Sequence, residues 1–381
     1  MSATAYPNYS PGLEGVIGGV TAISEIDSDR SSLVYRGIDV HDLAEKGSFE
    51  ETAYLLIYGK LPNAAELENF RETIGRERNV PQEVYTALKQ LPTTTHPMDM
   101  IRTAFSVVAS FDPDYEADNL DHDANVRKAV RILAKAGTMV ANGHRIRQGL
   151  EPIAGKPEHS IAQNFLYIMG GGVEPDPYTV TVMDASLTLY AEHGYNASTF
   201  ACRVCVATLS DLYSGIVTGI GGLEGRLHGG ANEEAMYMLQ EIGSPENAEA
   251  WIRDALATKK KIMGFGHREY KKGDSRAMYL TQVGKEIGRR KGDTKWGDIA
   301  DILERVMLEE KNLYPNVDFP AAYAYFLLGI PIDLYTPIFV IARVSGWSAH
   351  AIEQLDNNRL IRPKCIYEGP THAPFIPIAE R

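Results

Sequence analysis

The chain has 381 residues, about twice the length of a common domain, which predicts one large domain or two unequal ones. Its formal net charge of −12 argues against a general nucleic-acid surface, because neutralising phosphates requires clustered lysine and arginine. No charge-free run approaches the ~20 apolar residues of a membrane span, and no signal-peptide pattern begins the chain, so we expect a cytoplasmic protein.

The predicted elements begin with a β-prone region and continue as helices. Residues 12–40 combine closely spaced glycine, serine and aspartate with short β-prone pieces, which predicts a small hairpin. From Ser48 the pattern becomes helical, and Ser48 with Glu51 forms a capping box. Residues 197–217 are weakly charged, so we expect them inside the protein or in a contact between subunits.

Further helical stretches follow without alternating strands, which predicts an all-α fold. They cover residues 64–78, 81–90, 98–110, 125–147, 160–169, 178–192, 233–241, 246–259, 275–290, 299–306 and 318–329, and a last one runs through 353 before an irregular tail from 357.

A glycine-rich stretch surrounds His228. Four glycines between Gly219 and Gly225 predict an irregular connection before it, and Asn232 is placed to cap the helix that follows. The positive end of that helix dipole disfavours a protonated imidazole. A neutral imidazole can donate a hydrogen bond to a carbonyl that is becoming an enolate. An ordinary loop histidine fits the same residues, so both interpretations stay open.

Two more histidines, His193 and His267, also lie beside glycine where a helix starts or stops. His267 precedes a basic cluster that either binds anions or forms a solvated surface; its members are Arg268, Lys271, Lys272 and Arg276.

Arg343 and Asp318 stand out by their apolar surroundings. Arg343 follows the apolar run 337–342, where a charge should be paired or bind a ligand. Asp318 precedes Pro320 and an apolar helix. It either caps that helix or serves as a carboxylate base whose pKa is raised by partial desolvation.

Several common site types are not indicated. Cys202 and Cys205 have a redox spacing, but no second pair completes a metal site, so we expect both on a buried helix face. The chain has no phosphate loop, no complete dinucleotide fingerprint and no histidine pair with metal-ligand spacing.

Five segments in order resemble the citrate synthase family: His193–Arg203, Leu227–Glu234, Gly264–Arg276, Asn316–Pro320 and Gly346–Tyr367. Length, helical character and motif order agree over essentially the whole chain with the short bacterial and archaeal form. The resemblance implies a two-domain all-α fold, with residues 1–225 and 334–381 in a large domain and 226–333 in a smaller one. One position departs, because the family usually has a small aliphatic residue where this chain has Glu269.

The resemblance implies an acyltransferase that condenses acetyl-CoA with oxaloacetate and water to citrate and CoA, through an enolate and citryl-CoA, without a metal or other cofactor. Asp318 matches the base that removes the methyl proton, and His228 matches the donor to the thioester oxygen. His267 matches the residue that polarises the ketone. The matches to oxaloacetate contacts are His193, Arg276 and Arg343. The guanidinium groups of the two arginines suit carboxylates.

Arg362 matches a residue that reaches into the neighbouring protomer's site, which implies a homodimer with shared sites and leaves larger assemblies open. The family's CoA contacts match Lys261, Ile262, Gly264, Phe265, Gly266 and Lys271. Two alternatives stay open. One is 2-methylcitrate synthase, which uses the same catalytic set with propionyl-CoA, and the other is a catalytically silent helical assembly protein.

Overall fold

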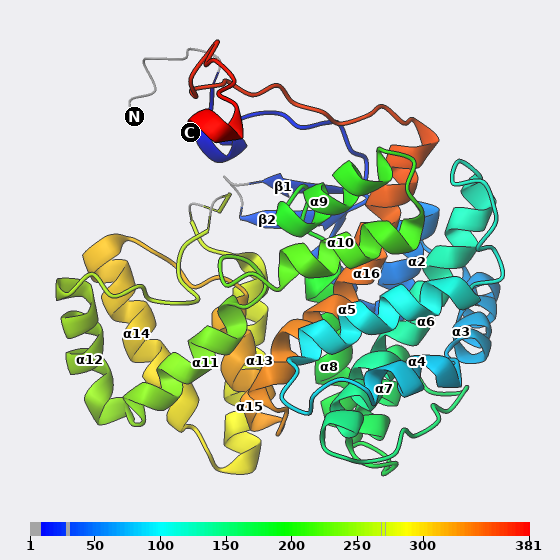
Figure 1. Ribbon diagram of the computed structural model, residues 1–381. Coiled ribbons are helices and arrows are strands. Elements are labelled where there is room, and N and C mark those ends of the chain that lie inside the picture. The colour runs from blue at the N-terminus through cyan, green and yellow to red at the C-terminus, as the bar shows by residue number, and fades with distance from the viewer. Residues whose placement is uncertain (1–8, 28–30, 268, 271) are drawn as a thin grey trace.

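The computed structural model describes residues 9–27, 31–267, 269–270 and 272–381. Within these ranges the chain forms sixteen α-helices, four short 3-10 helices and one three-stranded sheet (Figure 1). The prediction of an all-α fold is confirmed. None of the described helices combines the length and apolar character that crossing a bilayer requires.

The sheet is larger than the predicted hairpin. It is an antiparallel meander in which Glu25 pairs with Val34 and Val34 with Asp39. Asp39 then accepts a hydrogen bond from the backbone N–H of His41 and so caps a first helix that the sequence patterns did not reveal. The strands are β1 (Ser24–Asp27), β2 (Ser32–Tyr35) and β3 (Ile38–Asp39), and the helix is α1 (Val40–Lys46).

Two long helices, α6 and α16, pack against one another in the interior, and Figure 1 shows α16 crossing the molecule among the other helices. The predicted capping box forms only in part at the start of α2. The hydroxyl of Ser48 accepts from the N–H of Glu51 (3.4 Å), but the carboxylate of Glu51 accepts from that hydroxyl (2.8 Å), where a full box has it accept from the backbone N–H of Ser48. Helix α16 (Tyr335–Asp356) shares this part of the molecule with α2 (Phe49–Tyr58), α3 (Ala64–Glu77), α4 (Gln82–Leu88), α5 (Pro97–Val108), α6 (His122–Arg147), α7 (Ile161–Met169), α8 (Pro177–Tyr190), α9 (Ala197–Val206) and α10 (Leu212–Leu223).

The expectation of an irregular chain from Gly219 onward is wrong, because α10 continues through three of the four glycines. A Cβ atom at Gly219 would lie 2.9 Å from the indole of Trp347, and one at Gly222 would lie 3.1 Å from Cα of Ser198. The glycines therefore let α10 approach α16 and α9 closely, and this packing outweighs their low helix propensity. The irregular part is confined to residues 224–230.

Asn232 also differs from its predicted role. The next helix, α11 (Ala231–Ile242), begins after Gly230, so Asn232 lies inside the helix and does not cap it.

The remaining helices gather on one side of the molecule (Figure 1). In this group α15 packs against α11 and α13, and α12 packs against α14. The group spans the range predicted to form the smaller domain, and the division into two domains stays a prediction. Its further members are α12 (Pro245–Ala257), α13 (Ser275–Lys291), α14 (Lys295–Lys311) and α15 (Asp318–Leu327).

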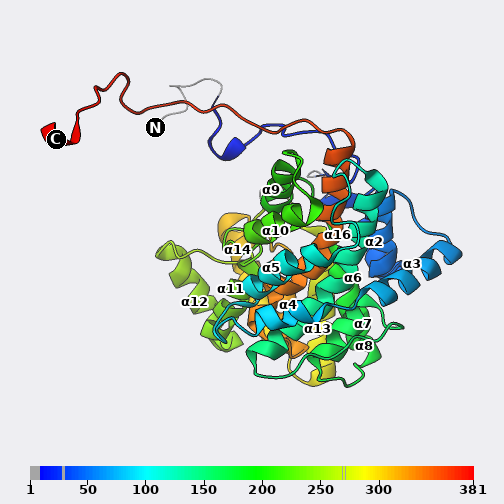
Figure 2. The same cartoon turned by 45° about the vertical axis from the view of Figure 1, so that its right-hand side comes forward.

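Both end segments lie outside the helical body. Residues 9–20 and the tail after α16 run close together, and the turned view shows the tail extending away from the helices (Figure 2). Several large apolar side chains of the tail are exposed: Leu360, Ile366, Tyr367, Phe375 and Ile378.

Candidate active site

A cavity of about 1050 Å³ lies where several parts of the chain meet. Among them are the N-terminal segment, the turn after α8, the connection between α10 and α11, and the connection between α12 and α13. This volume lies at the upper end of the ~300–1,000 Å³ common for ligand pockets. Six of the seven residues predicted to act in catalysis or to contact oxaloacetate line it, namely His193, His228, His267, Arg276, Asp318 and Arg343. The fold therefore brings together side chains from five separate chain segments.

His228 lies in the connection between α10 and α11. Its Nε2 atom is 2.8 Å from Oγ of Ser198 and 3.2 Å from Oδ1 of Asn196, both at the start of α9. Burial, together with the charge of Arg343, lowers the pKa of His228 to about 4. The imidazole is therefore neutral at pH 7, and burial is the main cause.

His267 lies in the glycine-rich connection between α12 and α13. Its Nδ1 atom accepts hydrogen bonds from the backbone N–H groups of Glu269 (3.0 Å) and Tyr270 (3.3 Å). Because an accepting nitrogen carries no proton, the neutral ring has its proton on Nε2. The side chain of Glu269 is exposed, and this residue supports His267 through its backbone alone. Its departure from the family pattern therefore leaves these contacts intact.

His193 is buried in the turn after α8 and faces the same group. Its Nε2 atom is 3.1 Å from the hydroxyl of Tyr270, and its ring centre is 5.0 Å from that of His267. Burial and the nearby charge of Arg276 hold the pKa of His193 well below its usual range. The cavity thus presents uncharged imidazoles from two different segments side by side.

Asp318 is the first residue of α15. Its N–H donates to Oδ1 of Asn316 (3.1 Å), and its own carboxylate accepts from the hydroxyl of Tyr190 (3.1 Å). The carboxylate is therefore directed at Tyr190 and does not cap the helix. Burial raises the pKa of Asp318 to about 6, against the lowering effect of the Tyr190 hydrogen bond. Such a value suits a base that works near neutral pH.

The two buried arginines of the cavity differ in their partners. Arg276 forms a two-point ion pair with Asp274, with N–O distances of 3.0 and 2.8 Å. Arg343 donates from Nε to the carbonyl of Tyr190 (2.9 Å), but its buried Nη1 has no hydrogen-bond partner among the described residues. Burial lowers the pKa of Arg343 to about 10, so it stays charged. A buried guanidinium nitrogen without a hydrogen-bond partner is costly, which favours binding of a carboxylate here.

The residues predicted to contact CoA form another wall of the cavity. Gly264 and Gly266 have φ angles of +81° and +79°, and the backbone of this segment is bonded to residues 314–316, just before Asp318. Lys261, Ile262, Gly264, Phe265 and Gly266 all line the cavity. Lys271 and Arg268 lie outside the described residues.

Arg362 does not join the other site residues. It lies exposed in the tail after α16 and does not line the cavity of its own chain. Within the described ranges, no three His, Cys, Asp or Glu side chains are grouped so that they could hold a metal ion.

The comparisons with known proteins agree over the whole chain. A family model described as "Citrate synthase, C-terminal domain" matches residues 12–364. Citrate synthase 2 of Bacillus subtilis (strain 168) is 49% identical over 97% of this chain and 98% of its own length. The chain belongs to the citrate synthase family. The prediction of an acyltransferase is thereby confirmed, and the alternative of a catalytically silent helical protein is set aside.

Solved structures of citrate synthases have the same fold. The enzyme of the archaeon Thermoplasma acidophilum, solved as a ternary complex with carboxymethyl coenzyme A and oxaloacetate, has a TM-score of 0.93 at 34% identity, covering 98% of this chain and 100% of that one. The enzyme of Thermotoga maritima MSB8 has a TM-score of 0.88 at 40% identity, covering 97% and 98%.

Relatives within the citrate synthase family carry two names. A 2-methylcitrate synthase of Mycobacterium tuberculosis is 46% identical over 95% of this chain and 91% of its own. Membership in the family is therefore compatible with transfer of either an acetyl or a propionyl group.

Several polar residues of this site were not singled out from the sequence. They are Tyr190, Asn196, Ser198, Tyr270 and Asp274, together with the N-terminal segment from Gly12 to Thr21, which lines the cavity. Asn196 carried a detectable signal, because Asn-Ala-Ser-Thr is a helix-capping pattern and Asn196 accepts from the N–H of Thr199. The others are common residue types whose roles depend on contacts far along the chain.

Proposed function

We propose that this protein condenses acetyl-CoA with oxaloacetate and water to give citrate and CoA. The single observation that carries the proposal is that Asp318, His228 and His267 line one cavity with Arg343, whose buried Nη1 has no hydrogen-bond partner in the described part of the chain. A carboxylate with a pKa of about 6, neutral imidazoles and a buried guanidinium are the groups that this reaction needs.

The first step forms an enolate. The carboxylate of Asp318 removes a proton from the methyl carbon of acetyl-CoA, and neutral His228 donates a hydrogen bond to the thioester oxygen where negative charge develops.

The second step forms the new carbon–carbon bond. Arg343 and Arg276 hold the carboxylates of oxaloacetate, and His193 contributes a further contact. The Nε2–H of His267 polarises the ketone, so that the enolate carbon attacks the ketone carbon and citryl-CoA results. Water then cleaves the thioester and releases citrate and CoA.

The remaining parts of the proposal concern assembly. Residues 1–225 and 334–381 form one domain and 226–333 a second, and closure of the two around oxaloacetate completes the acetyl-CoA site. Residues 261–266, together with Lys271, bind CoA. Arg362 reaches the cavity of a partner subunit in a homodimer, which agrees with its exposed place in the tail.

CoA release tests the proposal. Release that depends on oxaloacetate supports it, and release that is absent or independent of oxaloacetate contradicts it. The assay is repeated with a chelator, and complete loss of activity contradicts a metal-free reaction.

The acyl group needs a separate comparison, because relatives named 2-methylcitrate synthase are 46% identical. One methylene is worth about 1–3 kcal/mol in a pocket, so kcat/KM is measured for acetyl-CoA and propionyl-CoA under the same conditions. A clear preference for propionyl-CoA would contradict the proposed citrate synthase activity and support 2-methylcitrate synthase activity.

A further inference from the structure

We propose that Glu192 is a positioning residue for oxaloacetate, and that His350 holds its carboxylate in place. Glu192 fixes the turn that carries His193 and stabilises the charge of Arg343 without occupying the guanidinium. This inference rests on the proposed function, because it assigns Glu192 to the oxaloacetate part of that site.

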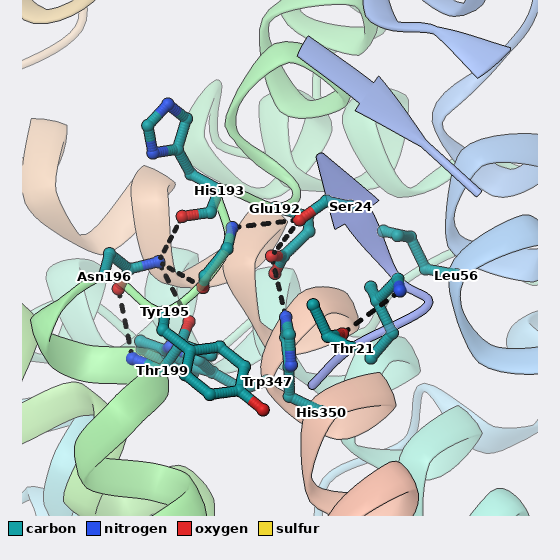
Figure 3. Close-up of polar contacts among 12 residues, drawn as sticks. Thr21, Ser24, Leu56, Glu192, His193, Tyr195, Asn196, Thr199, Trp347 and His350 are labelled. Carbon is teal, nitrogen blue, oxygen red and sulfur yellow. Dashed lines mark hydrogen bonds and ion pairs between the residues drawn. The ribbon is translucent and has the colours of Figure 1, made fainter. Parts of the chain in front are cut away.

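Glu192 immediately precedes His193, and its side chain is fully buried. Its Oε1 atom accepts hydrogen bonds from the hydroxyl of Ser24 (2.9 Å) and from Nε2 of His350 (2.8 Å). In Figure 3 the imidazole of His193 points away from these three side chains, which lie on the other side of the turn. Glu192 therefore acts from behind the residue that lines the cavity.

The direction of the hydrogen bond from His350 follows from its other neighbour. Nη1 of Arg203 is 3.1 Å from Nδ1 of His350, and a guanidinium can only donate. Nδ1 thus accepts, and the proton of the neutral ring lies on Nε2, directed at Glu192. Although burial alone would raise the pKa of Glu192, His350 and Arg343 hold it below its usual range.

The backbone on both sides of His193 is fixed by the same contacts. The N–H of Gly194 donates to the hydroxyl of Ser24 (3.0 Å), and the hydroxyl of Tyr35 donates to the carbonyl of Glu192 (3.0 Å). Ser24 thus joins the residue before His193 to the residue after it. Moving the carboxylate of Glu192 would break the hydrogen bond from Ser24 that helps to fix this turn.

Helix α16 packs directly onto the turn. A Cβ atom at Gly346, three residues after Arg343, would lie 2.4 Å from both the carbonyl of Ala191 and Oε2 of Glu192. Any side chain at this position would push the turn away from the helix that carries the guanidinium. The contact of Glu192 with α16 therefore fixes the position of His193 relative to Arg343.

Glu192 also offsets the charge of Arg343 without touching it. Oε2 of Glu192 has no hydrogen-bond partner, and no ion pair within 4.0 Å joins it to Arg343 among the described residues. The negative charge of Glu192 is nevertheless the strongest of those that favour protonated Arg343. Arg276, in contrast, has its Nε and Nη2 atoms paired directly with Asp274. Glu192 thus compensates Arg343 at a distance and leaves Nη1 for a substrate carboxylate.

The test measures KM for each substrate and kcat in matched variants. Glu192→Gln keeps the size and removes the charge, and we expect KM for oxaloacetate to rise about ten-fold or more while KM for acetyl-CoA changes less than about two-fold. Glu50→Gln is the matched control. Glu50 is equally buried, also has an unpartnered Oε2 and does not line the cavity, so its oxaloacetate KM should stay unchanged.

Variants of His350 keep the test decisive if Glu192→Gln does not fold. His350→Leu removes the donor and should raise the oxaloacetate KM, and His350→Gln, which retains an N–H at similar reach, should restore most of the affinity. An unchanged oxaloacetate KM in the Leu variant, or equal loss in the Leu and Gln variants, overturns the inference. Absence of oxaloacetate-dependent CoA release by the unmodified protein overturns the proposed function instead.

Discussion

The hydroxyl of Tyr190 donates a hydrogen bond of 3.1 Å to Oδ1 of Asp318. This bond stabilises the ionised carboxylate and partly offsets the burial that raises the pKa of Asp318 to about 6. The same tyrosine accepts through its carbonyl from Nε of Arg343 at 2.9 Å, so one residue of α8 contacts both the proposed base and the proposed carboxylate-binding group.

The first prediction concerns the pH dependence of catalysis. Tyr190→Phe removes the hydrogen bond and should raise the pKa of Asp318 further, which moves the acidic limb of kcat/KM upward by about half to one pH unit. A pH–rate profile measures the shift. A limb that stays in place or moves to lower pH would show that Asp318 is not the group observed.

The second prediction separates activity from stability at Asp318. Since burial raises its pKa from 3.8 to about 6, the folded protein binds this proton more tightly than the unfolded chain does. The ionised carboxylate therefore lowers stability above pH 6, and this loss disappears below the unfolded pKa. Asp318→Asn should raise the free energy of unfolding at pH 8 by about 1–3 kcal/mol, with little gain near pH 4.

Turnover of the same variant should fall about 10²–10⁴-fold, because the amide is no base. Denaturant unfolding at the two pH values and CoA release give both quantities. Binding of oxaloacetate should persist, and unchanged turnover would remove Asp318 from the mechanism.

The third prediction concerns the glycines of α10. Gly219→Ala places a methyl group against the buried ring of Trp347 and should destabilise the protein by about 1–3 kcal/mol. Gly221 is its matched control, since a Cβ there meets nothing within 4 Å. Gly221→Ala should stabilise the helix by about 0.5–1 kcal/mol. Similar effects of both substitutions on urea unfolding would contradict close packing at Gly219 as the reason for glycine.

The fourth prediction tests the shared site. Arg343→Ala and Arg362→Ala should each lose most oxaloacetate affinity in pure form. In a hybrid dimer, one site carries both substitutions and the other carries neither. Equal mixing after subunit exchange should therefore restore about a quarter of the unmodified activity. No recovery in a mixture shown to contain hybrids would place Arg362 outside the partner's site.

Local signals in the sequence were sufficient for many elements. Ser48 caps α2 as predicted, because an N-cap hydrogen bond joins residues only three positions apart. The prediction of an irregular chain at the glycines of α10 was wrong for the opposite reason. Their role depends on close contacts with Trp347 and Ser198, which lie far from them in sequence. Glycine patterns report backbone freedom and do not report which helix approaches.

The candidate site divides in a similar way. His193, His228 and His267 could be selected by their glycine neighbours, and the structure places all three at one cavity. The hydrogen bond between Glu192 and His350 joins positions 158 residues apart, and no local pattern indicates such a pair. Positions that hold a catalytic side chain in place become visible only when the helices are packed.

The hydrogen bond from the backbone of Ala22 to Glu353 has a consequence for synthesis, because it spans 331 residues of the chain. The N-terminal wall of the cavity is fastened to the last long helix, which also supplies Arg343. A nascent chain on the ribosome therefore carries its early segments unfastened until translation is almost finished. A polypeptide released before α16 is made lacks Arg343 and the partner of Ala22, so its cavity is incomplete.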